Sequence, residues 1–482
     1  MKYLKHPWIF LILSCIIVIV VKIPHLGLPY FFDETFSYYP AVLEMARVGP
    51  SMLPGTISLV LAKGHPLFFY FLASSWMKLI AGDSVTLMRI FPLLVALIAL
   101  FVFHRFAKRH TNILLANIAV VLLAIQPLFL AQASLVLPSI LIFILLMMSF
   151  DSYLSRSYGL YAFYGSLLML TKETGAVFIM VFGLAYLIEN YRNLNSKTFW
   201  RNLVLLAVPV FVYVLFLILH YHEFGVFFFS EHLDFITFNS NTVQNKFNSA
   251  VWMLFLAQGR NLVVYTAVLA LIVLLFRKKE IEYRRFLIFS LSILILFLIF
   301  TSVNFFGYRY VLPVLGIVLL ASSVLIQQIK TKYQALNIAY IVCILSVSAY
   351  YSATKRGQSD VDLGYTQYLV VHQQMVKYCE QQSWYDKEIG GGYNMVMSLR
   401  ERCAKYLSTD KNFKTNHLPG LENRDIIIYD STCWPVEMPE SEKSKLTLIK
   451  RIEYKNHWGE IYSTSSAKEA TQPIQKQTTV TE

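Results

Sequence analysis

LMRIFPLLVALIALFVF, residues 87–103, decides the class of this chain, because the run carries a single charge, Arg89, near its start. A helix that crosses the hydrocarbon core of a bilayer needs about 20 predominantly apolar residues. Similar runs recur at residues 8–21, 114–130, 135–154, 160–170, 176–188, 203–220, 262–276, 286–303, 310–326 and 336–351. Together they predict an all-α polytopic membrane bundle with about eleven spanning helices.

Composition favours a membrane protein over a soluble one. Of the 482 residues, 56% are hydrophobic and only 15% are charged, which is unusual for a soluble domain. The formal net charge of +13 is also compatible with nucleic-acid binding. The basic residues, however, lie in clusters between the apolar runs, which is the pattern that sets membrane orientation. We therefore expect a lipid bilayer around the chain and no nucleic acid.

The basic clusters also predict the orientation. They lie at residues 104–110, 156, 191–201, 277–285 and 330–332. The apolar run at 66–80 has only about fifteen residues, which is short for a span. If this run does not cross, every cluster lies on the side of the basic N-terminus, as the positive-inside rule requires. We therefore predict a helix on the outer surface at 66–80, a cytoplasmic N-terminus and an outer C-terminal region, in a bacterial inner membrane.

The composition changes after the last apolar run, so three parts are expected. Residues 1–352 form the transmembrane domain, residues 353–465 an extracytoplasmic α/β domain, and residues 466–482 a disordered tail rich in Thr, Gln and Ser. In the α/β domain, 425–429 reads as a buried strand, 394–406 as a helix, and 446–452 with 460–463 as a hairpin. Three cysteines in this domain, Cys379, Cys403 and Cys433, allow one disulfide, whose pairing the sequence leaves open.

Two adjacent carboxylates, Asp33 and Glu34, follow the first apolar run and are surrounded by aromatic residues. An ordinary explanation is that Asp33 caps the helix that follows. The alternative is a general base at the membrane surface, where desolvation raises the pKa of a carboxyl group toward useful values.

Cations at the outer ends of apolar runs oppose the topological bias and suggest an anionic ligand. Lys172, Arg309 and Arg89 are placed there and suit the phosphate of a lipid-linked substrate. A neighbouring acid, Glu173, and a histidine of the first outer loop, His65, are candidates for positioning ligands. A later outer loop contains many polar residues: His220, His222, Glu223, Glu231, His232 and Asp234. Their spacing matches no metal motif, so we predict no metal site.

Five short motifs in order resemble the protein mannosyltransferase and aminoarabinose transferase-like glycosyltransferases, which have the GT-C membrane fold. The motifs are Asp33-Glu34, Gly64-His65-Pro66-Leu67, Leu87-Met88-Arg89-Ile90-Phe91-Pro92, Leu170-Thr171-Lys172-Glu173 and Tyr308-Arg309-Tyr310. The resemblance covers roughly residues 8–326, and each motif alone is weak. Many relatives have a charge in the second outer turn. Here residues 131–139 have none, and Gln132 or Ser139 would substitute by hydrogen bonding.

The resemblance implies transfer of a sugar from a polyprenyl-phosphate donor to a hydroxyl of a protein, lipid A or glycan acceptor, with inversion. Asp33 matches the family's catalytic carboxylate, and Glu34 would assist it. Lys172, Arg309 and Arg89 would then bind the donor phosphate. His65, Glu173, Tyr308 and Gln132 would position donor and acceptor. No cofactor is required, because a lipid phosphate already leaves as a stable anion.

Three other functions would each require different features of the sequence. A lipid-linked oligosaccharide flippase would need polar residues at the midplane of several helices or broken spans in matched halves, and the sequence has neither. An O-antigen polymerase or ligase should have a large late outer loop rich in Arg, which is absent before the terminal domain. A non-enzymatic envelope protein would tolerate loss of Asp33. The sequence leaves the sugar, the acceptor, the lipid length and the oligomeric state open.

Overall fold

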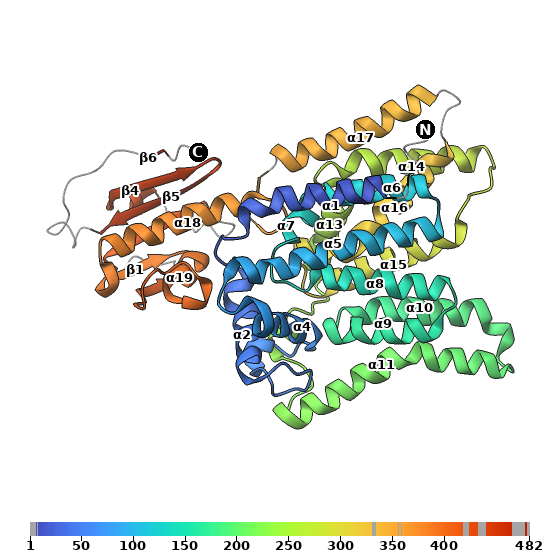
Figure 1. The fold of residues 1–482 in the computed structure, drawn as a ribbon, viewed down its shortest axis with the longest axis horizontal. Helices are drawn as coiled ribbons and strands as arrows, with labels where there is room; N and C mark the ends of the chain where they lie inside the picture. Colours follow the sequence, from blue (N-terminus) through green and yellow to red (C-terminus); the bar gives the residue numbers. More distant parts are fainter. Residues whose placement is uncertain are drawn as a thin grey trace.

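The computed structural model describes residues 6, 8–329, 334–354, 356–357, 359–417, 424–431, 440–464 and 478–479. Long helices lie side by side in a bundle, and a small α/β domain lies at one end of it (Figure 1). The bundle helices are α1 (Ile9–Lys22), α5 (Val85–His110), α6 (Ile113–Ala124), α7 (Pro127–Gln132), α8 (Ser139–Leu154), α9 (Tyr158–Thr171), α10 (Gly175–Asn190), α11 (Lys197–Phe224), α14 (Arg260–Phe276), α15 (Arg284–Val303), α16 (Leu312–Gln328) and α17 (Gln334–Thr354).

All of the predicted apolar runs are helical. One run, at 114–130, is divided into α6 and α7, because Pro127 disfavours a helical conformation for the residue before it. By length and hydropathy, five described helices could cross a membrane: α5, α11, α15, α17 and the continuous segment Tyr308–Gln328 that contains α16. A bent pair, Ser240–Leu256 with Arg260–Phe276, makes six. The chain is therefore a multi-pass membrane protein, and the predicted count of about eleven spans relies on shorter helices as well.

The loop between α1 and α5, which the sequence predicts to lie on the outer side and which is called the first outer loop below for that reason, is also mostly helical. It contains η2 (Ile23–His25), η3 (Glu34–Tyr38), α2 (Tyr39–Val48), α3 (Leu59–Ala62), α4 (Phe68–Trp76) and η4 (Met77–Ala81). The run predicted as a surface helix at 66–80 thus becomes α4 and η4. Helices α2 and α4 lie at the end of the bundle that also carries the α/β domain (Figure 1). Later loops contain η5 (Tyr191–Asn193), α12 (Ser230–Asp234), α13 (Ser240–Val251), η6 (Trp252–Leu256) and η7 (Tyr308–Val311).

The C-terminal domain is a sheet in the order β2-β1-β3-β5-β4-β6, with α18 along it (Figure 1). Its elements are α18 (Gly364–Gln381), η8 (Trp384–Asp386), β1 (Glu388–Gly391), α19 (Tyr393–Arg400), η9 (Arg402–Ala404), β2 (Lys414–His417), β3 (Ile426–Asp430), α20 (Glu440–Lys443), β4 (Thr447–Tyr454), β5 (His457–Ser463) and β6 (Thr478–Thr479). Strand β1 is parallel to β2 and β3, whereas β5 is antiparallel to β3 and β4.

The predicted strand and hairpin of this domain are confirmed as β3 and as β4 with β5. The predicted helix at 394–406 is shorter, because α19 ends at Arg400 and a separate turn follows. Cys379 and Cys403 are free thiols, and Cys433 lies outside the described residues. Of the predicted tail at 466–482, only Thr478 and Thr479 are described, as β6 beside β4.

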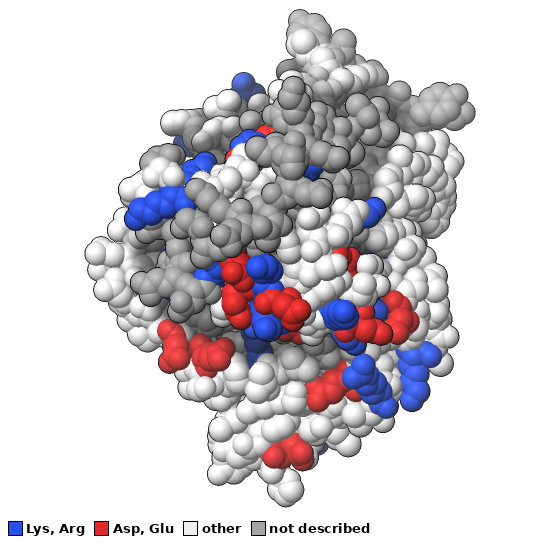
Figure 2. Space-filling view, turned by 90° about the vertical axis from the view of Figure 1, so that its left-hand side faces the viewer, with Lys and Arg blue, Asp and Glu red and all other residues white. Residues whose placement is uncertain are grey.

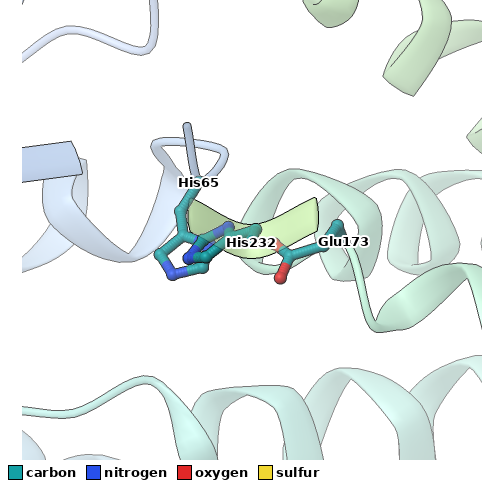
Figure 3. Close-up of side chains that lie close together, drawn as sticks. All are labelled: His65, Glu173 and His232. Carbon is teal, nitrogen blue, oxygen red and sulfur yellow. Dashed lines mark hydrogen bonds and ion pairs between the residues drawn. The ribbon is translucent and has the colours of Figure 1, made fainter. Parts of the chain in front are cut away.

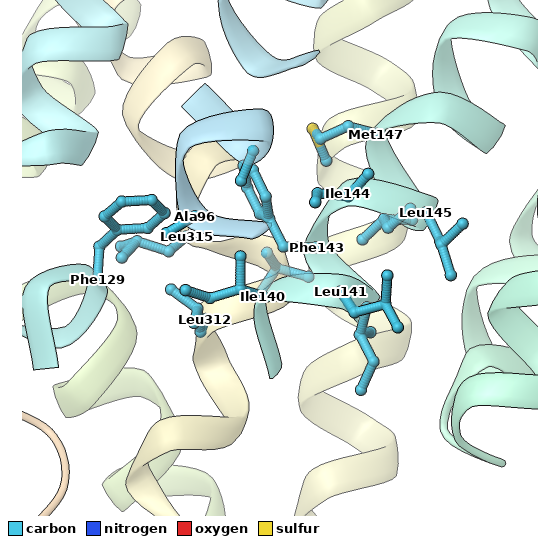
Figure 4. Packing of buried hydrophobic residues seen from close by; sticks show 14 of the residues in the cluster. Ala96, Phe129, Ile140, Leu141, Phe143, Ile144, Leu145, Met147, Leu312 and Leu315 are labelled. Carbon is cyan, nitrogen blue, oxygen red and sulfur yellow. The ribbon is translucent and has the colours of Figure 1, made fainter. Parts of the chain in front are cut away.

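The core of the bundle lies between α5, α8 and α16. Apolar side chains from these helices interlock, and Phe143 and Ile140 of α8 face Leu312 and Leu315 of α16 (Figure 4). The most apolar window of the α16 segment is 72% buried, whereas that of α17 is 11% buried. Helix α16 is therefore a central helix, and α17 is a peripheral helix whose apolar surface faces outward, as in a bilayer.

The α/β domain is fixed to the first outer loop. Tyr30 donates its backbone N–H to the carbonyl of Ala404 at 3.1 Å, and the Tyr406 hydroxyl donates to the carbonyl of Tyr30 at 3.1 Å. At the outer end of α1, the buried Lys22 ammonium donates to the Tyr365 hydroxyl at 2.8 Å. These contacts hold the domain against the residues that lead into Asp33.

Candidate functional site

The two adjacent carboxylates point to different partners because of the backbone around them. Phe32 has a φ of +45°, a conformation that costs energy for a bulky residue and is often found at functional sites. A π-helical turn, Glu34–Tyr38, follows, and such turns also occur often at functional sites. The result is that Glu34 points into the protein and Asp33 toward a cavity-lining arginine.

Glu34 and Arg89 form a closed, fully buried ion pair. Their side chains are 0% and 1% exposed, and the Arg89 Nη2 to Glu34 Oε2 distance is 3.1 Å. Glu34 also accepts the N–H groups of Phe31 and Val136, at 3.0 and 2.6 Å. Arg89 donates its other N–H groups to the carbonyls of Leu28, Pro29 and Ser134.

This pair differs from the role predicted for it. A guanidinium has five N–H donors, and all those of Arg89 have protein acceptors here. The prediction that Arg89 binds the donor phosphate does not fit these contacts, and Glu34 has no lone pair directed at a substrate. The pair instead joins the first outer loop to the uncharged turn at 131–139. Backbone groups of this turn bind Arg89 and Glu34, so no charged side chain is needed there.

Asp33 forms an ion pair with Arg309 at the outer end of α16. The other arm of the guanidinium holds a second carboxylate, Asp360, with Nη1 to Oδ2 at 2.6 Å. The side chains of Asp33, Arg309 and Asp360 are 17%, 9% and 11% exposed. Three segments that are far apart in the sequence therefore meet at one buried arginine, where charge–charge interactions are stronger than in bulk water.

Asp360 lies on a short segment, 359–363, immediately before α18, and this strap is anchored on both sides. Gln132 donates its side-chain amide to the Asp360 carbonyl at 2.8 Å, and Gln258 does the same to the Val361 carbonyl at 2.8 Å. Asp362 accepts backbone N–H groups of Gly357 and Gly364. Gln132, predicted to position the ligand directly, therefore reaches the site through the strap backbone.

A small cavity of about 40 Å³ lies beside Arg309. Lys172, Tyr310 and Tyr38 supply its polar wall, and the Lys172 ammonium lies 4.5 Å from the centre of the Tyr310 ring. The opposite wall is apolar and includes Phe178, Phe297, Phe300 and Ile142. This volume suits a few water molecules, so a sugar phosphate would have to widen it. A larger apolar cavity between α6, α14, α16 and α17 lies away from these cations.

One predicted residue, Tyr308, has unexpected surroundings. Tyr308 is half-exposed and packs edge-on against Phe306 and Trp252. It does not line the cavity, and Tyr310 does so in its place.

His65, Glu173 and His232 form a second cluster at this end of the bundle (Figure 3). His65 Nδ1 is 3.0 Å from Glu173 Oε2, and the ligand atoms of the three side chains all lie within 4.8 Å of one another. Gly64, at φ +70°, allows the backbone of Phe229 to approach, because a Cβ at Gly64 would lie 3.3 Å from the Phe229 nitrogen. Two imidazoles and a carboxylate are a ligand set that zinc enzymes use, so these residues could hold a divalent metal, contrary to the prediction of no metal site.

The electrostatics of this cluster favour an ionised Glu173 and a neutral His232. Burial opposes the charge of Glu173, but His65 and Lys172 outweigh it and hold the pKa of this carboxyl well below its usual range. Burial, reinforced by the neighbouring His65, lowers the pKa of His232 to about 4. The sequence pointed to all three residues separately but gave no signal that they meet, and it gave none for Asp360.

Comparison with known proteins identifies the fold. Residues 57–386 match the model of the Alg9-like mannosyltransferase family. No curated protein matches the chain by sequence. ArnT from Cupriavidus metallidurans bound to undecaprenyl phosphate is similar in structure, with a TM-score of 0.56 and 12% identity over 93% of this chain and 97% of that one. The Archaeoglobus fulgidus oligosaccharyltransferase in complex with Zn and sulfate has a TM-score of 0.50 and 11% identity over 94% and 73%. The fold is the GT-C fold of membrane glycosyltransferases.

Proposed function

Because the chain belongs to the Alg9-like mannosyltransferase family, we propose that it transfers a sugar from a polyprenyl-phosphate donor to a hydroxyl acceptor on the outer face of a bacterial inner membrane. The observation that carries the proposal is that Arg309 and Lys172 line one cavity with an apolar wall, and that Arg309 is paired with Asp33. The cations suit a phosphate, the apolar wall suits the first isoprene units, and Asp33 supplies a base. The similar ArnT structure holds undecaprenyl phosphate, which fits this assignment.

In the proposed reaction, Asp33 accepts the proton of the acceptor hydroxyl, and the hydroxyl oxygen attacks the anomeric carbon from the face opposite the phosphate. A new carbon–oxygen bond forms as the bond from the anomeric carbon to the phosphate oxygen breaks. The electron pair stays on the lipid phosphate, and the configuration of the sugar is inverted. The transition state has oxocarbenium character.

Lys172 and Arg309 have the role of stabilising the charge that develops on the departing phosphate. Fixed cations in a partly dehydrated site are often the largest contribution to such a step. Glu34 and Arg89 keep the loop that carries Asp33 in place. His65, Glu173 and His232 are assigned to acceptor positioning, and no step requires a metal, because the leaving group is a stable phosphate.

The proposal predicts that Asp33→Asn abolishes transfer and that Asp83→Asn does not. Asp83 lies in the same outer loop, and its side chain is 86% exposed, so its substitution controls for charge and expression. The measurement is transfer of labelled sugar from undecaprenyl-phosphate donors in membranes with matched amounts of protein. Loss of a general base lowers the rate by about 10²–10⁴-fold. Equal rates in wild type and Asp33→Asn would refute the assignment, and EDTA should leave the wild-type rate unchanged.

A further inference from the structure

Arg309 is saturated with carboxylates although it is the cation best placed for a phosphate. Asp33 holds one arm of the guanidinium and Asp360 holds the other. Arginine binds phosphate most strongly when two parallel N–H groups are available. A phosphate that binds both terminal nitrogens of Arg309 in this way must therefore take the place of at least one of the two carboxylates.

The structure indicates which carboxylate yields. Asp33 follows Phe32, whose backbone is in the left-handed region, and precedes the π-helical turn that Glu34 anchors in the core. Asp360 has its backbone carbonyl bound by Gln132. Its side chain makes one described contact with a charged group, the one with Arg309. Rotation about its own side-chain bonds would release Arg309 and leave the strap in place.

We propose that Asp360 is a positioning residue that occupies Arg309 in the absence of donor and competes with the lipid phosphate for it. This inference rests on the proposed function, because it assumes a phosphate at Arg309. It assigns a residue between the membrane bundle and the α/β domain to the donor site. It also gives that residue a purpose: the carboxylate returns to Arg309 and assists release of the lipid phosphate after transfer.

Charge determines the direction of the expected effect. Lys172 and Arg309 carry two positive charges, which Asp33 and Asp360 offset. Removing the charge of Asp360 leaves a net positive site for the phosphate, and like charges a few ångströms apart in a half-buried site interact strongly. Asp360→Asn should therefore bind undecaprenyl phosphate more tightly, by on the order of tenfold. Its kcat should fall relative to its KM, because release of the product becomes slower.

The test is equilibrium binding of labelled undecaprenyl phosphate to the full-length protein in lipid nanodiscs, together with kcat and KM for transfer. Asp360→Glu keeps the charge and should remain near wild type. Asp362→Asn is the matched control, because it removes a carboxylate of the same strap that binds Gly357 and Gly364 instead of Arg309. Asp360→Ala removes the same charge with a smaller side chain and replaces the Asn variant if that variant does not fold.

Each outcome decides the proposal. Tighter binding by Asp360→Asn alone supports it. Unchanged or weaker binding by Asp360→Asn overturns it while leaving the proposed function intact. Equal tightening in Asp362→Asn also overturns it, since the effect would then come from loosening the strap. Absence of saturable binding by wild type would overturn the proposed function, and this inference with it.

Discussion

At the scale of single residues, neighbouring carboxylates have been given different tasks by their surroundings. Asp33 is partly accessible and holds Arg309, whereas Glu34 is fully buried and holds Arg89. A buried ion pair is costly to desolvate, and it is tolerated when hydrogen bonds satisfy the remaining donors and acceptors. Both conditions are met at Glu34 and Arg89, as expected of a structural pair, and this leaves Asp33 as the carboxylate available for the proposed reaction.

The first stability prediction concerns this buried pair. Glu34→Gln leaves the Arg89 charge buried without a carboxylate, and we expect a loss of about 3–5 kcal/mol in the free energy of unfolding. Glu189→Gln is the control. It breaks a pair with Arg285 whose side chains are 36% and 39% exposed, and exposed pairs contribute at most about 1 kcal/mol. Denaturant unfolding in detergent, followed by tryptophan fluorescence, measures both. Similar small losses would show that Glu34 is not a structural anchor.

At the scale of elements, α16 packs closely against α5 and α8 where it passes them. A Cβ on Gly316 would lie 2.7 Å from Phe143 and 2.9 Å from Phe103, which is closer than side chains can approach. Gly183 in α10 has nothing within 4 Å of the same position. The absence of a side chain at Gly316 thus lets the helix beside Arg309 sit close to α8 and fixes the outer end of α16.

We predict that Gly316→Ala destabilises the protein relative to Gly183→Ala. Overpacking costs about 1–3 kcal/mol, whereas alanine favours a helix over glycine by about 1 kcal/mol at both positions. The difference between the two variants therefore isolates the packing effect. Unfolding temperatures in the same detergent provide the measurement. A Gly316→Ala variant as stable as Gly183→Ala would mean that α16 can move away from α8 at no cost.

Elements were predictable from the sequence to the extent that each is encoded locally. Long apolar runs specify the helices of the bundle, the short apolar run at 425–429 specifies β3, and alternation at 446–463 specifies the β4–β5 hairpin. Pairings between distant segments have no local signal. Asp360 meets Arg309 across 51 positions, and His65 meets Glu173 across 108. The misassignment of Arg89 has the same origin, since backbone carbonyls that saturate a guanidinium leave no trace in the sequence.

At the scale of the whole molecule, the two ends of the bundle differ in their charged residues. The face formed by the α/β domain carries Asp and Glu beside Lys and Arg (Figure 2), including the pairs of Arg451 with Glu453 and Glu460. The other end contains the basic clusters at 104–110, in the last turns of α5, and at 277–285, between α14 and the start of α15. The positive-inside rule places segments rich in Lys and Arg on the cytoplasmic side. The end with the basic clusters should therefore be cytoplasmic, and the α/β domain at the other end should lie outside the cell membrane.

This orientation predicts the outcome of cysteine labelling in intact spheroplasts. Asp410→Cys, on a fully exposed side chain of the α/β domain, should react with a membrane-impermeant maleimide, and Lys279→Cys, between α14 and α15, should react only after permeabilisation. Cys379 is buried, and burial raises the pKa of the Cys403 thiol to about 11, which leaves little thiolate. Cys15 and Cys343, on the apolar helices α1 and α17, are replaced by serine in every variant to keep background labelling small. Cys433 is replaced by serine in every variant. The opposite result would be labelling of Lys279→Cys, and no labelling of Asp410→Cys, in intact spheroplasts. It would show that the orientation is reversed and that Asp33 and Arg309 lie on the cytoplasmic side, where a donor displayed on the outer leaflet cannot reach them.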